Sequence, residues 1–201
     1  MKDTADGKPE GERAPSPQPE VADRGTWARV ARRIRVPLGF IVSIFYVWLA
    51  KPTRASLIAG TVVLLPGLLL RAAASGHVRK NEQLTTSGPY AYTRNPLYLG
   101  SIILGVGFAL AARSWWIVVT MLAMFAVIYV PVIGGEERFL RQAFPEYDDY
   151  ARQVPRLWPR LTAYSSRQGA YSFTLYWKHR EYNVILGCVA VLASLVAKLL
   201  W

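Results

Sequence analysis

Apolar and polar stretches alternate along the chain in a pattern that predicts membrane-spanning helices. Long apolar runs cover residues 36–50, 55–74, 97–112, 115–133 and 183–200. A helix that crosses the hydrocarbon core of a bilayer needs about 20 mostly apolar residues. The first run is short for a crossing, but its aromatic and basic flanks extend it, because long basic side chains can snorkel. The pattern therefore predicts an all-α polytopic membrane protein with about five transmembrane helices.

Two polar segments precede the first apolar run. Residues 1–25 are rich in Pro, Gly, Glu and Asp and have no apolar periodicity, which predicts a disordered tail. No apolar h-region follows the first basic residue, so we expect no signal peptide. Residues 26–35 are basic and are compatible with an amphipathic helix on the membrane surface or with a solvated charge run. We expect a membrane domain over residues 36–201.

Composition narrows the class of protein. The chain is 52% hydrophobic, yet its formal net charge is +11. A soluble nucleic-acid-binding protein would carry such charge on a polar chain, so that class is excluded. Cys188 is the only cysteine, which excludes a disulfide framework and a thiol-based metal cluster. His77 and His179 lack the spacing of zinc ligands, so we expect no metal.

The positive charges also predict the orientation in the membrane. If the N-terminus is cytoplasmic and five helices cross, 20 of the 24 Lys and Arg residues lie on the cytoplasmic side. Such residues are enriched in cytoplasmic loops. We therefore expect a protein integral to the cytoplasmic (inner) membrane, with its N-terminus and its active site on the cytoplasmic side.

A polar, aromatic segment with the sequence TSGPYAYTRNPLYLG, residues 86–100, separates the second apolar run from the third. Gly88-Pro89 predicts a turn. Asn95-Pro96 predicts a helix start, with Asn95 as the N-cap and Pro96 at the first helical position. The free N–H groups of a helix start suit a carboxylate or a phosphate. An ordinary interfacial turn is the alternative, because Tyr and Arg favour the membrane boundary.

A second polar segment follows the fourth apolar run and contains Glu136 and Glu137. Phe139, Leu140 and Ala143 have helical spacing, so we expect the two glutamates to open an amphipathic helix at the membrane exit. Acidic residues favour helix N-termini for electrostatic reasons alone. Ionisable groups at the mouth of a membrane cavity also serve function, and the pattern leaves both interpretations open.

Glycines in the third apolar run have a structural interpretation. Gly105-Val106-Gly107 lacks the third glycine and the preceding strand of a dinucleotide-binding fingerprint, which excludes a Rossmann domain. Together with Gly100 and Ser101, these residues predict a surface of small side chains for close helix packing.

The segment at residues 86–100 and the segment that begins at Glu136 together resemble a known family. Residues 88–90 (GPY) and 94–100 (RNPLYLG) are similar to the GPY…RHPxYxG signature of integral-membrane methyltransferases. These are the isoprenylcysteine carboxyl methyltransferases and the related phospholipid methyltransferases. The second segment is similar to the family's second block, EE…F…Y..Y…VP, through Glu136-Glu137, Phe144, Tyr147, Tyr150 and Val154-Pro155. The order of the blocks and the hairpin between them also match, and the resemblance covers about residues 80–160.

The resemblance implies an S-adenosylmethionine-dependent methyltransferase that acts at the membrane on a lipid or lipid-linked acceptor. The cofactor-binding residues that it implies are Glu82, Gln83, Leu84, Thr85, Tyr90, Asn95, Pro96, Leu97, Tyr98 and Glu136. A carboxylate can pair the amino group of this cofactor, and tyrosine rings can face its sulfonium. By position alone, the candidate catalytic residues for acceptor binding are Arg94, Glu137 and Arg156.

Two positions depart from the family pattern. Asn95 stands where the family usually has His, so any proton-handling role of that side chain is lost. Val132 stands where the eukaryotic prenylcysteine enzymes have an Arg that contacts the substrate. The acceptor therefore stays open.

Two other functions remain as alternatives. A membrane reductase that uses a nicotinamide cofactor would place basic residues such as Arg138, Arg141 and Arg152 on phosphates. A non-catalytic membrane scaffold would keep the helices and use the basic N-terminal segment to hold anionic lipid. The aromatic stretch 164–181 is compatible with a membrane interface or with an acceptor pocket.

Overall fold

The computed structural model describes residues 42–79, 82–164 and 169–201. These residues are helical or irregular and contain no strand. The predicted tail, the basic segment and the start of the first apolar run lie outside the described residues. The helical elements in order are residues 42–49, α2 (Arg54–Ser75), the 3₁₀ turn η1 (Gly88–Ala91), α3 (Pro96–Ala112), α4 (Trp115–Met124), the π-helical turn η2 (Phe125–Tyr129), α5 (Val130–Ala143), α6 (Tyr147–Gln153), α7 (Phe173–Lys178) and α8 (Tyr182–Leu200).

Three of these helices are long and apolar enough to cross a membrane: Arg54–Ser75, Trp115–Ala143 and Tyr182–Leu200. Another apolar helix, α3, has 17 residues and is shorter than a full crossing. The predicted all-α, polytopic membrane architecture is confirmed. The expected number of about five crossings is not reached by length among the described residues, because α3 is short and the first helix is described only from residue 42.

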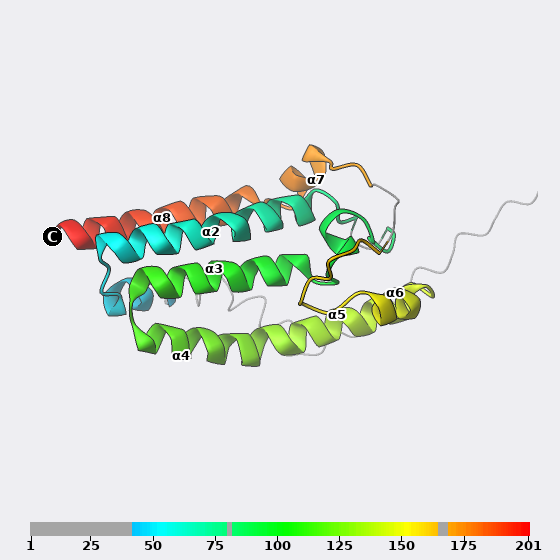
Figure 1. The fold of residues 1–201 in the computed structure, drawn as a ribbon, viewed down its shortest axis with the longest axis horizontal. Coiled ribbons are helices and arrows are strands. Elements are labelled where there is room, and N and C mark those ends of the chain that lie inside the picture. The colour runs from blue at the N-terminus through cyan, green and yellow to red at the C-terminus, as the bar shows by residue number, and fades with distance from the viewer. Residues whose placement is uncertain (1–41, 80–81, 165–168) are drawn as a thin grey trace, which may run out of the picture. The chain divides into compact units, whose positions relative to one another are not determined.

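Helices α2 and α3 pack closely because glycines face each other across their interface. A Cβ added at Gly60 would lie 2.6 Å from the Gly107 carbonyl oxygen, and one added at Gly67 would lie 3.1 Å from the Gly100 carbonyl oxygen. These two pairings run in opposite directions along the chain, so the helices are antiparallel. Figure 1 shows α2 between α3 and α8. The predicted small-residue surface is confirmed at Gly100 and Gly107, whereas Gly105 lies outside this contact.

Gly60→Val is expected to lower the free energy of unfolding by about 1–3 kcal/mol, because the added side chain collides with the backbone of α3. Gly105→Val is the matched control, since the nearest atom to a Cβ there is the Met121 Cε at 4.0 Å. Thermal unfolding of both variants in detergent tests this. Equal melting temperatures for the two variants would contradict the close α2–α3 packing.

At one end of the molecule, hydrogen bonds to backbone carbonyl groups join α8, α3 and the helix formed by residues 42–49. The Lys198 Nζ donates to the carbonyl oxygens of Val47 (2.7 Å) and Trp48 (2.8 Å), and the Lys51 N–H donates to the Ala112 carbonyl oxygen at 2.7 Å. Lys198 thus satisfies carbonyl groups at the end of the helix formed by residues 42–49. The exposed tryptophans of this end are Trp48, Trp115, Trp116 and Trp201.

The position of Glu136 and Glu137 within their helix differs from the prediction. Helices α4 and α5 and the π-helical turn between them form one helix over Trp115–Ala143, so Glu136 and Glu137 lie inside it and do not open a new helix. Two glycines in a helix cost only about 1 kcal/mol each. Burial of Ile133 and Glu137 on both sides of Gly134-Gly135 keeps the helix continuous.

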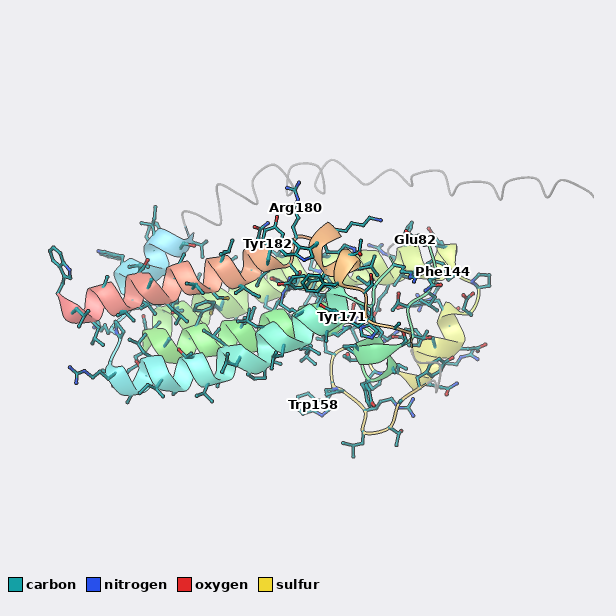
Figure 2. The ribbon with its side chains drawn as sticks, turned by 90° about the horizontal axis from the view of Figure 1, so that it is seen from above. Glu82, Phe144, Trp158, Tyr171, Arg180 and Tyr182 are labelled. Carbon is teal, nitrogen blue, oxygen red and sulfur yellow. The ribbon has the colours of Figure 1, made fainter. Side chains whose placement is uncertain are left out.

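The aromatic stretch after residue 168 folds onto the C-terminal end of α2. The Ser172 N–H donates to the Gly76 carbonyl oxygen at 2.9 Å, and the Tyr171 ring meets the His77 ring edge-on at 5.8 Å. Tyr176 is buried, whereas Phe173 and Trp177 are exposed. Figure 2 labels Tyr171 here and shows Trp158 projecting from the loop that follows α6. The exposed aromatic side chains are suited to a membrane interface.

Candidate functional site

The site forms where the segment before α3 meets the segment after α6. The Arg94 N–H donates to the Pro155 carbonyl oxygen at 2.9 Å. Two further backbone bonds, from Arg160 to Tyr92 and from Tyr164 to Ala91, have lengths of 3.0 Å. The two motif segments, residues 86–100 and residues 136–155, are thus linked by a main-chain hydrogen bond that does not depend on their side chains.

A cluster of buried tyrosines packs against this junction. Tyr147, Tyr150 and Val154 are buried together, with Leu84 packed against them. The Tyr150 hydroxyl donates to the Tyr90 carbonyl oxygen at 2.7 Å. Burial raises the pKa of Tyr150, so its hydroxyl keeps the proton that this bond needs. The cluster fixes the turn that carries Tyr90.

Glu137 is the centre of a buried polar network. Its carboxylate accepts two hydrogen bonds from Arg156, from Nε at 3.0 Å and from Nη2 at 2.5 Å. The Arg94 Nη2 lies 3.7 Å from the same carboxylate, and only 5% of Glu137 is exposed. The structure therefore brings all three candidate catalytic residues together.

Asn95 occupies the N-cap position of α3, with Pro96 first in the helix, as predicted. Its side chain makes no capping hydrogen bond. The Asn95 Nδ2 donates instead to the Glu137 carboxylate at 3.4 Å and to the Arg156 carbonyl oxygen at 3.0 Å. The side chain that could have capped the helix is used to link the two motif segments.

Glu136 faces a different environment from its neighbour. It is exposed, and its carboxylate accepts a hydrogen bond of 2.8 Å from the Tyr98 hydroxyl. The Tyr98 ring meets the Tyr129 ring edge-on at 5.7 Å. Burial, and then the charge of Glu136, raise the pKa of the Tyr90 phenol, so this hydroxyl stays protonated. A carboxylate and two tyrosines, Tyr98 and Tyr129, therefore gather at the polar end of α3.

The other residues implied by the family resemblance have separate surroundings. Glu82 is exposed and lies 3.8 Å from the Lys178 Nζ, Gln83 is exposed, and the Thr85 hydroxyl accepts from the Arg79 N–H at 3.3 Å. Pro96 is fully buried, and the Leu97 carbonyl oxygen accepts from Arg71 at 3.2 Å. None of the contacts in the described part of the chain ties residues 82–85 to Glu136.

Sequence reasoning missed Arg71 and Glu181, which join α2, α3 and α8 beside this site. The Arg71 Nε lies 2.5 Å from the Glu181 carboxylate, and the Arg71 Nη1 donates to the Ser101 hydroxyl at 2.5 Å. Both charged side chains are largely buried. The signal was available, because each residue is an ionisable group near the edge of an apolar run.

Comparison with known proteins identifies the family of the central segment. Residues 68–147 match the model of the phospholipid methyltransferase family, which covers both α3 and the two glutamates. The predicted relationship to this family of membrane methyltransferases is confirmed. No solved structure matches the chain significantly.

Two curated relatives have names from a different area of biology. The chain is 37% identical over 106 residues to the cobalt-zinc-cadmium resistance protein CzcN of Cupriavidus metallidurans, a match over 53% of this chain and 48% of that protein. It is 39% identical over 88 residues to the nickel-cobalt-cadmium resistance protein NccN of Alcaligenes xylosoxydans xylosoxydans, over 44% of this chain and 41% of that protein. Each match spans less than half of the relative.

Proposed function

We propose, from the phospholipid methyltransferase match over residues 68–147, that this membrane protein transfers a methyl group from S-adenosylmethionine to a lipid or lipid-linked acceptor. The reaction takes place at the cytoplasmic boundary of the membrane. The observation that carries the proposal is the exposed Glu136 carboxylate, held by the Tyr98 hydroxyl at the junction of the two motif segments.

The residues around Glu136 fit the chemistry of this cofactor. S-adenosylmethionine supplies, when bound, a methyl group on a positively charged sulfonium. The Glu136 carboxylate would pair the cofactor's amino group, since an opposite charge is the strongest available partner. The faces of Tyr98 and Tyr129 can attract a cation. The start of α3 at Asn95-Pro96 carries the positive end of the helix dipole, which suits the cofactor's carboxylate.

We assign Glu137 a positioning role. Its carboxylate is buried and already accepts hydrogen bonds from Arg156 and Asn95, so it holds the two motif segments together. Arg94 and Arg156, which pair with it, also line a cavity on the same side and are the candidates to contact an acceptor. The neutral Asn95 holds this geometry without taking up a proton.

Methyl transfer to membrane lipid tests the proposal. The purified protein, reconstituted with a total lipid extract, is incubated with methyl-labelled S-adenosylmethionine, and label in the organic phase is measured. We expect label with the native chain and about 100-fold less with Glu136→Ala, because misplacement of one reactant costs about that factor. Oxidation of NADPH without any labelling would instead support the reductase alternative, and S-adenosylmethionine binding without turnover would support the scaffold.

A further inference from the structure

A cavity of about 470 Å³ opens on the polar side of α5 and α6. Four of its lining residues are arginines, and two are acidic, so the lining has an excess of positive charge. The arginines are Arg94, Arg141, Arg152 and Arg156, and the acids are Glu137 and Asp148. Arginine presents planar, paired N–H groups that match the oxygens of a phosphate.

Arg94 is the buried wall of this cavity and has too few partners. Its side chain is 13% exposed. Within the described part of the chain, its Nε has no hydrogen-bond partner, and its Nη1 reaches only the Tyr147 hydroxyl at 3.5 Å. The Glu137 carboxylate is 3.7 Å away. Burial of a charged group is costly unless it is hydrogen-bonded, so Arg94 is poised for an additional anion beside it.

The arginines at the mouth are held by surface ion pairs, and Arg141 also lies over the Tyr147 ring, with its guanidinium carbon 5.7 Å from the ring centroid. Arg141 lies 2.7 Å from Asp148, and Arg152 lies 3.4 Å from Asp149. All four side chains are half-exposed or more. Exposed ion pairs and exposed cation–π contacts stabilise a protein little, so both arginines can turn towards a ligand.

We propose that this cavity binds a phosphate group, either on the headgroup of an anionic lipid or as free phosphate. Glu137 and the cavity lie on a different side of α5 from Glu136, because neighbouring helical residues point in different directions. The cavity lies beside the polar C-terminal part of the helix Trp115–Ala143, just beyond its apolar part. If the apolar part spans the membrane, this is the level of the lipid headgroups. Arg94 and Arg156 line this cavity and are also the candidates to contact the acceptor, so the lipid form of this inference rests on the proposed function. Binding is measured without the cofactor, so failure of phosphate binding and failure of methyl transfer can be told apart.

The test compares two variants of the full chain that lose the same charge. Arg141→Gln/Arg152→Gln removes the exposed arginines of the cavity. Arg138→Gln/Lys178→Gln removes two exposed charges that do not line it. In the first arm, inorganic phosphate is titrated against each protein in phosphatidylcholine nanodiscs at constant ionic strength. In the second arm, native mass spectrometry measures phosphatidylglycerol retained from mixed nanodiscs.

We expect the cavity variant to bind about tenfold more weakly than the native chain in at least one arm, because charge-assisted hydrogen bonds are lost. The control variant should retain native binding. A loss confined to the lipid arm identifies a headgroup as the ligand, and a loss in the phosphate arm identifies free phosphate. Absence of binding by the native chain, or equal binding by both variants in both arms, would overturn the proposal.

Discussion

Glu137→Ala is expected to lower the free energy of unfolding by about 3–5 kcal/mol, the typical cost of removing one partner of a buried ion pair. The substitution removes the carboxylate that lies 3.7 Å from the buried Arg94, its one acidic neighbour among the described residues, and both hydrogen bonds that Arg156 donates. The Asn95 amide also loses an acceptor. The junction between the two motif segments should therefore loosen.

Unfolding in mixed micelles, followed by circular dichroism, measures this change. The matched control is Glu136→Ala, the adjacent residue on the same helix, whose carboxylate is exposed and accepts one hydrogen bond. That control should shift the unfolding midpoint little. A Glu137→Ala protein as stable as the control would show that the buried network does not hold the site together.

Arg71→Ala is expected to have an effect of the same size, about 3–5 kcal/mol, because Glu181 is left buried without its counter-charge. Arg71 also donates to the Ser101 hydroxyl and to the Leu97 carbonyl oxygen, so one substitution weakens the junction of α2, α3 and α8.

A double substitution separates the pair's charge from its shape. Arg71→Met/Glu181→Leu removes both charges and should regain part of the lost stability, because no unpaired buried charge remains. Arg79→Ala, at an exposed position after α2, is the control and should behave as the native chain. If the double variant were no more stable than Arg71→Ala, the unpaired buried charge of Glu181 would not be the cause of the lost stability.

The sequence predicted the helices well where local signals mark their ends. The run predicted to begin at residue 55 begins at Arg54, because Thr53 and Ser56 form a capping box. The two-residue turn between α3 and α4 is also as predicted, with Arg113 in the left-handed conformation. The capping residues lie within a few residues of the ends of the hydrophobic runs, so the ends of these helices can be predicted without knowledge of any tertiary contact.

The errors arise where distant contacts decide the structure. Glu136 and Glu137 are predicted to open a helix, yet the helix that begins before them continues, with Ile133 and Glu137 buried on either side of Gly134-Gly135. The Asn95 side chain could cap α3 locally, but Glu137, from a segment 42 residues away, takes its amide. The π-helical turn that carries Tyr129 has no local signal in the sequence.

The motif residues were brought together more completely than their spacing predicts. Their position in the sequence alone makes Arg94, Glu137 and Arg156 candidates, and these residues form one network in the structure. The family resemblance alone implies residues 82–85, and their contacts lie elsewhere, with Lys178, Arg79 and the tyrosine cluster. Resemblance names residue positions, whereas contacts depend on how the loop packs.

Equilibrium binding of S-adenosylmethionine to the detergent-purified protein tests the central claim most directly. Glu136→Ala is the test variant, and Glu146→Ala is its control, because Glu146 is an exposed glutamate outside the residues that the resemblance implies for the cofactor. We predict that the native chain and the control bind, and that Glu136→Ala binds about 10–100-fold more weakly while remaining folded, since a charge-assisted hydrogen bond is lost. A folded native chain that does not bind, or undiminished binding by Glu136→Ala, would contradict the account.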